Sequence, residues 1–161
     1  MRNVLCNRDI GLITRKRILR CYVWTTLLYG AETWTLTKTM LKKLVAFELW
    51  AYRRMLRISW KDKISNEIVL RRIQSQRILT KTIKERKLQY FGHLVRRGDL
   101  QRVLLEAKVA GKRGRGRPKT SWTDNIKSWT GLSYGEAVVM AKDRERWRII
   151  SSNPRETEDG T

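Results

Sequence analysis

Apolar residues recur three and four positions apart through most of this 161-residue chain, and proline is absent before Pro118. This spacing follows one face of an α-helix, whereas a half-buried strand would alternate apolar and polar residues. Proline would interrupt a helix interior, so its absence leaves long helical segments open to the chain. We therefore expect an all-α fold, with a helical bundle, a basic glycine-rich loop and a small two-helix C-terminal unit.

The first half of the chain is expected to form three long helices, and the stretch SWKDKISNEIVLRRI between the last two is interpreted as a loop followed by a short helix capped by Ser65 or Asn66. The first runs from Thr14, a candidate N-cap, to about Tyr29. The second covers about 38–58. The third covers about 78–97 and ends at Gly98, because glycine favours helix C-termini.

Two serine patterns mark helix starts near the C-terminus. Ser121 with Asp124, and Ser133 with Glu136, each have the spacing of a capping box. The second of these helices is expected to run to about Ile150. The expected domains are residues 1–110, which are helical, the basic glycine-rich loop 111–120, the two-helix unit 121–150 and a flexible tail 151–161.

The chain carries a large excess of positive charge, with 36 Lys+Arg against 15 Asp+Glu and a net charge of +21. Such an excess repels itself in the compact state and attracts polyanions. It is the electrostatic footprint of a nucleic-acid-binding protein, so DNA, RNA or both are the expected partners through phosphate contacts. The longest apolar stretch is too short to cross a bilayer, so no membrane partner is expected. The expected location is the nucleus, the cytoplasm or both.

Residues for catalysis or metal binding are not clustered in the sequence. Cys6, Cys21 and the single histidine, His93, lack zinc-site spacing, and the cysteines are expected to be free thiols. A polymerase or nuclease needs grouped carboxylates to hold metal ions, and here the aspartates are isolated. We therefore expect no catalytic residues, no metal, no cofactor and no enzyme activity of this chain's own.

One face of the expected helix 38–58 is basic and carries a tryptophan. The other face is broad and apolar, which indicates a core contact. A solvated face normally mixes both signs of charge, whereas this one is only basic. Arginine beside an aromatic ring suits phosphate contact and base or sugar stacking, although packing of the tryptophan against another helix is an equal alternative. The candidate binding residues of this face are Lys42, Lys43, Trp50, Arg53, Arg54 and Arg57.

Two polar residues lie on or beside apolar faces. Glu48 lies within the apolar face of helix 38–58, where a carboxylate is costly unless it is paired. A structural ion pair with an arginine is therefore expected, and not a general base. His93 borders the apolar stripe of the third helix, where a histidine is usually packed and hydrogen-bonded.

The stretch GKRGRGRPKTSW, residues 111–122, combines glycines with closely spaced cations. Its segment 115–118 matches the Arg-Gly-Arg-Pro core of the AT-hook, a peptide that enters the narrow minor groove of A·T-rich DNA. General phosphate binding, a nuclear-import patch and a passive hairpin are the alternatives. The candidate binding residues here are Lys112, Arg113, Arg115, Gly116, Arg117, Pro118 and Lys119.

Five segments in a fixed order carry a resemblance to a known family. They are LLYGAETWTLTK, LVAFELWAYRRMLRISWKDKISNEIVLRRI, TIKERKLQYFGHLVRR, GKRGRGRPKTSWTDNIKSWTGLS and DRERWR. Together they resemble the C-terminal part of the reverse transcriptase polyprotein of non-LTR (LINE-type) retrotransposons, especially the RTE and BovB group. That polyprotein is an RNA-directed DNA polymerase and endonuclease, and its endonuclease and its metal-binding aspartate motif are absent from this sequence.

The resemblance implies that residues 1–110 form a thumb-like helical region. Thumb helices of reverse transcriptases lie along the template–primer duplex, and the basic face of helix 38–58 suits that role. The chain would then grip template–primer or target DNA without catalysis, with the absent palm domain as a further partner. Two alternatives stay open: a degenerate remnant with no selected activity, and a stand-alone helix-turn-helix or AT-hook-like DNA-binding protein.

Overall fold

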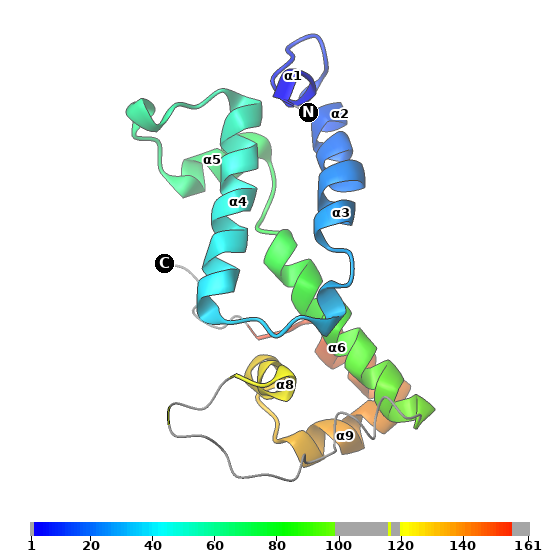
Figure 1. Cartoon of the computed structure of the whole chain (residues 1–161). Helices are drawn as coiled ribbons and strands as arrows, with labels where there is room; N and C mark the ends of the chain where they lie inside the picture. Colours follow the sequence, from blue (N-terminus) through cyan, green and yellow to red (C-terminus); the bar gives the residue numbers. More distant parts are fainter. Residues whose placement is uncertain (1, 99–115, 117–119, 156–161) are drawn as a thin grey trace. The chain divides into compact units, whose positions relative to one another are not determined.

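The computed structural model describes residues 2–98, 116 and 120–155, and within these ranges helices are the only regular secondary structure (Figure 1). The all-α prediction is confirmed. The described residues form two compact units: unit 1 comprises 2–31 and 38–82, and unit 2 comprises 32–37, 83–98, 116 and 120–155. This division falls inside one helix, whereas the expected boundary is the loop 111–120. Nearly all of that loop lies outside the described residues, so the expected domain limits stay a prediction.

The helices that precede residue 79 differ in part from those expected. Helix α4 ends two residues before the expected end of helix 38–58. The expected helix from Thr14 instead begins at Leu12, after the N-cap Gly11, which makes no side-chain capping bond. Thr14 is therefore an interior helical residue and not an N-cap. The elements are α1 (Arg2–Leu5), α2 (Leu12–Ile18), the π-helix η1 (Leu19–Trp24), α3 (Thr25–Leu27), the 3-10 turn η2 (Ala31–Thr33), α4 (Lys38–Leu56), the 3-10 turn η3 (Trp60–Asp62) and α5 (Asn66–Ile73).

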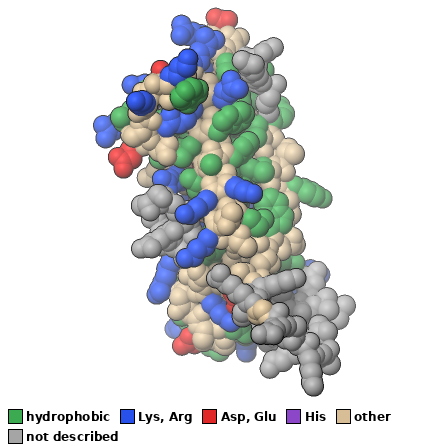
Figure 2. All heavy atoms as spheres, turned by 60° about the vertical axis from the view of Figure 1, so that its left-hand side comes forward, with side chains coloured by type: hydrophobic (Ala, Val, Ile, Leu, Met, Phe, Trp, Pro, Cys, Tyr) green, Lys and Arg blue, Asp and Glu red, His purple; other side chains and the backbone are tan. Residues whose placement is uncertain are grey.

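The apolar face of α4 forms much of the core of unit 1, as expected. Leu41 and Met55 of α4 are buried, and Val69 of α5, the neighbouring helix, is fully buried. Trp24 of η1 meets Phe47 of α4 edge-on, with ring centroids 5.9 Å apart. On the side of unit 1 that carries α4, η3 and α5, Lys and Arg side chains lie among hydrophobic ones (upper part of Figure 2).

Two basic side chains of α2 bind the C-terminal ends of neighbouring helices. The Arg15 guanidinium donates to the carbonyl of Met55 at 2.8 Å, and Lys16 Nζ donates to the carbonyl of Ile73 at 2.9 Å. Carbonyls in the last turn of a helix lack partners within the helix and attract cations. Two of the positive charges of α2 therefore stabilise helix ends inside unit 1.

Glu48 is fully buried, and its carboxylate accepts hydrogen bonds at the start of helix α6 (Leu79–Arg97). Its Oε1 accepts from Tyr52 Oη and from the backbone N–H of Ile78, both at 2.9 Å, and from the N–H of Leu79 at 3.3 Å. Burial raises the pKa of the Glu48 carboxyl, although these bonds and the positive charge of Arg77 lower it. Glu48 therefore caps the start of α6, and the arginine expected beside it contributes through the positive charge of Arg77, which favours the ionised carboxylate.

Among the described residues, unit 2 contains the rest of α6 from residue 83 and three further helices. The helix expected from Ser133 to about Ile150 is divided at Asp143, so the expected two-helix unit has three helices. The Asp143 carboxylate accepts from the backbone N–H of Glu145 at 3.0 Å and of Arg146 at 3.1 Å, which starts a new helix. The three helices are α8 (Trp122–Thr130), α9 (Tyr134–Lys142) and α10 (Arg144–Ser152).

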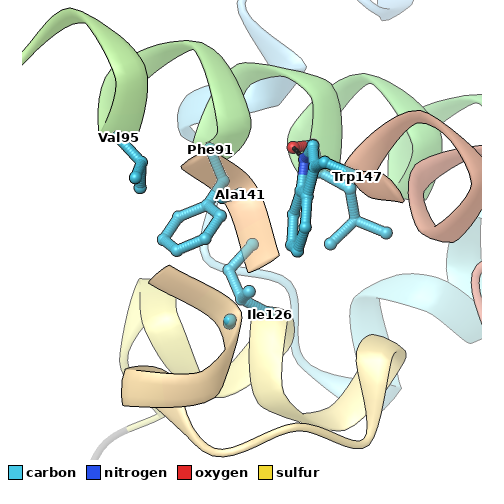
Figure 3. Packing of buried hydrophobic residues seen from close by; sticks show 7 residues of the cluster. Phe91, Val95, Ile126, Ala141 and Trp147 are labelled. Carbon is cyan, nitrogen blue, oxygen red and sulfur yellow. Dashed lines mark hydrogen bonds between the residues drawn. The ribbon is translucent and has the colours of Figure 1, made fainter. Parts of the chain in front are cut away.

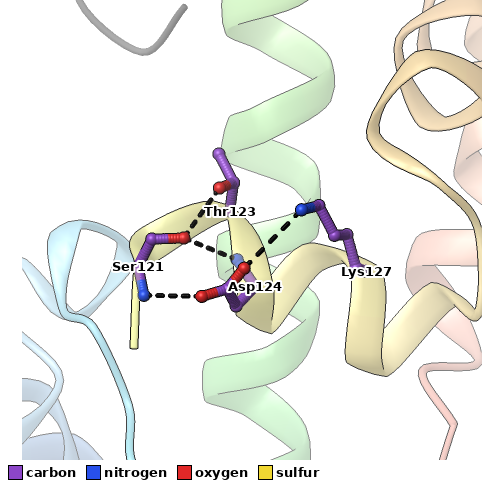
Figure 4. Close-up of polar contacts among 4 residues, drawn as sticks. All are labelled: Ser121, Thr123, Asp124 and Lys127. Atoms are coloured by element: carbon purple, nitrogen blue, oxygen red, sulfur yellow. Dashed lines mark hydrogen bonds and ion pairs between the residues drawn. The ribbon is translucent and has the colours of Figure 1, made fainter. Parts of the chain in front are cut away.

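Both expected capping boxes are present. The Ser121 N–H donates to Asp124 Oδ2 at 2.7 Å, and the Asp124 N–H donates to Ser121 Oγ at 3.3 Å (Figure 4). Ser133 and Glu136 make the same pair of bonds, at 2.8 and 3.3 Å. Hydrogen bonding from Ser121 holds the pKa of the Asp124 carboxyl below its usual value. These bonds use the N–H groups that a helix start leaves without partners.

The core of unit 2 lies where α6 meets α8, α9 and α10 (Figure 3). Trp147 of α10 packs on Phe91 of α6, with ring centroids 5.4 Å apart, and its Nε1 donates to the carbonyl of Leu88 at 2.8 Å. Gly92 lets the indole approach the backbone of α6, because an added Cβ would lie 2.3 Å from Trp147 Cδ1. His93, on the same helix, is exposed and not packed as expected.

Lys87 is fully buried and fastens the segment 32–37 to α6 and α8. Its Nζ donates to the Trp34 carbonyl at 2.6 Å and to Asn125 Oδ1 at 2.7 Å, and it lies 4.7 Å from the ring centroid of Trp122. Asn125 in turn pairs with both the N–H and the carbonyl of Leu36. Burial lowers the pKa of the Lys87 ammonium to about 7.

The stability of the chain is expected to depend on pH through Lys87. The pKa of Lys87 is about 7 in the fold and 10.5 in the unfolded chain. Between these two pH values the unfolded chain binds more protons than the folded one, so the free energy of unfolding rises with pH. The volume-conserving change Lys87→Met removes this contribution. Between pH 7 and about pH 9, we therefore expect the free energy of unfolding of wild type to gain about 2 kcal/mol relative to that of the variant. Urea unfolding of both proteins at several pH values measures this difference. A difference that stays constant with pH contradicts the prediction.

Candidate nucleic-acid interface

The C-terminal half of α4 presents an aromatic ring with a cation on it. Trp50 is 51% exposed, and it stacks on Phe47 with ring centroids 5.9 Å apart and planes 19° apart. The Arg54 guanidinium lies 5.5 Å from the centroid of the Trp50 ring, within the range of a cation–π contact. Phe47 itself reaches the core through Trp24. The exposed indole is therefore fixed on the helix rather than loosely attached.

The turn η3 presents a second tryptophan on a fixed backbone. Ser59 caps the turn: its N–H donates to Asp62 Oδ2 at 2.7 Å, and its Oγ accepts from the Lys61 N–H at 3.4 Å. Lys63 ends the turn in the left-handed conformation, with φ of 48°. Trp60, the first residue of the turn, is 83% exposed. A capped turn thus holds a large apolar side chain out in solvent.

The C-terminal half of α4 and the turn η3 line one open groove of about 890 Å³ in unit 1. Its cations attract phosphate, and among the described residues no carboxylate lines it. The upper part of Figure 2 shows this side of the chain, where Lys and Arg side chains lie beside hydrophobic ones. The lining residues used below are Trp50, Arg53, Arg54, Arg57, Trp60 and Lys63.

Two of the groove's arginines also hold its walls in place. Arg53 donates to the Ile64 carbonyl at 2.7 Å and to Asn66 Oδ1 at 2.9 Å, which ties the segment after η3 to α4. Arg57 donates to the Cys6 carbonyl from both Nε and Nη2, at 3.1 and 2.7 Å. All these acceptors are neutral, so both guanidinium groups keep their full charge at the groove.

The structure brings together four of the six residues predicted on helix 38–58, and one of the four, Arg57, lies just after the end of α4. Trp50, Arg53, Arg54 and Arg57 line the groove, whereas Lys42 and Lys43 are exposed on α4 outside its lining. Of the predicted loop residues, Gly116 is described: it is exposed, and its φ of 133° is a backbone conformation that glycine adopts readily. The others lie outside the described residues. They are Lys112, Arg113, Arg115, Arg117, Pro118 and Lys119.

Sequence reasoning missed Trp60 and Lys63, which lie in a stretch interpreted as a loop. A signal was present, because Ser59 and Asp62 have capping-box spacing around Trp60. That spacing fixes the turn, but it does not reveal that the turn faces the C-terminal half of α4. The groove arises from that tertiary arrangement.

Other classes of site receive no support from the described part of the chain. Within it, His, Cys, Asp and Glu side chains form no group of three or more that would hold a metal ion. No helix in the same part has the length and apolar character needed to span a membrane.

Comparison with known proteins connects the chain to a transposon. The chain is 28% identical over 148 residues to a transposon-derived protein of Caenorhabditis elegans, in a match that covers 84% of this chain and 53% of that relative. The chain therefore spans about half the length of this relative. No family model and no solved structure matches the chain. The similarity supports a transposon origin for this chain.

Proposed function

We propose that this chain is a nucleic-acid-binding C-terminal fragment of a non-LTR retrotransposon reverse transcriptase. It grips template–primer or target DNA through the groove between α4 and η3, and it supplies no catalytic residue. The observation that carries the proposal is the groove itself, where four cations and two exposed tryptophans meet without a carboxylate among the described residues. The similarity to a transposon-derived protein supports the transposon origin in this proposal. The resemblance of the sequence segments supports a reverse transcriptase as the parent enzyme.

Phosphate contact explains why the cations are concentrated here. Each phosphate that a Lys or Arg neutralises releases condensed counterions from the nucleic acid, which favours binding at low salt. Arg53 and Arg57 serve this purpose from fixed positions, because their hydrogen bonds to neutral carbonyl and amide oxygens hold them there. The exposed Arg54 and Lys63 are the better choice for a test, because no backbone carbonyl is described as their partner.

The double replacement Arg54→Ala with Lys63→Ala is expected to weaken binding to duplex DNA. The affinity at fixed moderate salt should fall about tenfold or more, and the slope of log affinity against log salt should decrease by about 2, since two phosphate contacts are removed. Fluorescence anisotropy with a labelled duplex across a salt series measures both quantities. Circular dichroism checks that the helical content of the variant is unchanged.

A matched control separates the groove from the net charge of the chain. Lys142→Ala with Arg144→Ala removes the same two charges from exposed positions of unit 2. This control should change the affinity by a much smaller factor, because its cations do not line the groove. Equal losses in the two double variants would attribute binding to overall charge and would reject the groove as the interface.

A further inference from the structure

Both exposed tryptophans of the chain lie in one groove. All seven tryptophans fall within the described residues, and five of them are buried or half-buried. Trp50 and Trp60 are the two exceptions, and both line the groove between α4 and η3. An indole left in water forgoes the gain from burial, so two exposed indoles at one basic site indicate a binding surface.

The two indoles differ in how much of the ring is open. Trp50 already stacks on Phe47 and carries the Arg54 guanidinium. Trp60 is 83% exposed, and the Ser59–Asp62 capping box holds the turn on which it lies. Because the turn is fixed in advance, a ligand that stacks on Trp60 has little backbone to order. Trp60 therefore offers the larger free aromatic surface of the groove.

Flat aromatic ligands attached to negative charge fit this combination. Bases inside a duplex stack on one another and leave no face for a side chain, whereas unpaired bases can stack on an aromatic ring. A basic groove that follows the phosphates, with aromatic rings under the bases, is how single-stranded nucleic acid is bound. A protein partner fits less well, because interface cores are depleted of charge and this groove has four cations.

We infer that the groove binds an unpaired stretch of nucleic acid, with a base stacked on Trp60 and the adjacent phosphates on Arg54 and Lys63. The inference rests on the proposed function, and it adds to it the single-stranded character of the ligand. It assigns Trp60 a role in choosing unpaired over paired strands, while the cations supply affinity for both.

The test compares single strands with and without bases, in DNA and RNA form, with a duplex. Oligodeoxyuridine, oligouridine, an abasic oligonucleotide with the same number of phosphates and a blunt duplex are titrated into the full chain at one salt concentration. Trp60→Ala is expected to weaken binding to the two base-bearing single strands about tenfold, which is within the effect of losing one base–aromatic stack. The same variant should leave binding to the abasic strand and to the duplex within about twofold, because the phosphate contacts remain.

Two further variants make the result specific. Trp60→Phe keeps an aromatic face and should retain most of the affinity for unpaired bases. Tyr29→Ala removes an aromatic side chain that is 87% exposed in unit 1 outside the groove lining, and it should change nothing. A preference for oligodeoxyuridine or for oligouridine identifies DNA or RNA as the source of the unpaired strand.

The outcomes separate this inference from the proposed function. If wild type binds all four ligands with steep salt dependence and Trp60→Ala weakens none of them selectively, the phosphate groove stands and the stacking role is overturned. An equal loss for abasic and base-bearing strands overturns it as well. If no ligand binds in a salt-dependent way, the proposed function fails and the inference fails with it.

Discussion

Replacing Gly92 with alanine is expected to lower the free energy of unfolding by about 3 kcal/mol, because it overpacks a closed core and breaks a hydrogen bond. The new Cβ would lie 2.3 Å from Cδ1 and 2.4 Å from Nε1 of Trp147. This indole is buried on Phe91, and its Nε1 donates to the Leu88 carbonyl, so it has no free direction in which to move. Urea unfolding of wild type and variant measures the loss, and near-ultraviolet circular dichroism reports on the tryptophan environment.

Gly135 provides the matched control for this replacement. It lies in the first turn of α9, and an added Cβ there meets nothing within 4 Å. Gly135→Ala should therefore be neutral or raise stability by up to about 1 kcal/mol, since alanine is the better helix former. If both variants lose the same free energy, the close approach of Trp147 to α6 is not what makes Gly92 sensitive.

Removal of the Glu48 carboxylate is expected to have a comparable effect in unit 1. Glu48→Ala leaves Tyr52 Oη and the backbone N–H groups of Ile78 and Leu79 buried without their acceptor, and it opens a cavity. We expect a loss of about 3 kcal/mol in the free energy of unfolding, with early loss of protection at the start of α6. Chemical denaturation measures the first effect, and hydrogen exchange measures the second.

Glu48→Gln tests whether the acceptor or the charge matters. The glutamine Oε1 can take the place of the carboxylate Oε1, which accepts the three shortest bonds, so the cost should stay within about 1 kcal/mol. Burial raises the pKa of Glu48 in the fold, so its contribution to stability is greatest below the ordinary pKa of glutamate and declines as pH rises through the raised pKa. The glutamine variant should lose this decline. If Glu48→Gln lowers the free energy of unfolding as much as Glu48→Ala does, the negative charge is essential, and a neutral hydrogen-bond acceptor is not sufficient at this position.

Features that depend on residues close in sequence could be predicted. The caps at Ser121 and Ser133 follow from patterns a few residues long, and both are present. The start of α4 at Lys38 also follows from the periodicity of its own residues. The division at Asp143 was missed because the apolar spacing continues across it, while the local carboxylate bonds to Glu145 and Arg146 outweigh that pattern.

Features that depend on remote residues could not be predicted in this way. The Glu48 carboxylate accepts from the N–H groups of residues thirty positions further along the chain, which no helical wheel can place. The same holds for Lys87, whose acceptors come from Trp34 and Asn125. At the candidate site, the wheel grouped Trp50 with the arginines of α4, and only the fold added Trp60.

The segment 32–37 has a consequence for any attempt to dissect this chain genetically. The polypeptide enters unit 2 at residue 32, leaves it at residue 38 and returns at residue 83, so no single cut separates the two units. A fragment that begins after residue 82 would contain the rest of α6 with α8, α9 and α10, but it would lack the Trp34 and Leu36 backbone groups that Lys87 and Asn125 bind. Unit 2 therefore depends on a stretch of chain that lies far from its other helices in the sequence, and deletion mapping at helix boundaries would misassign where function resides.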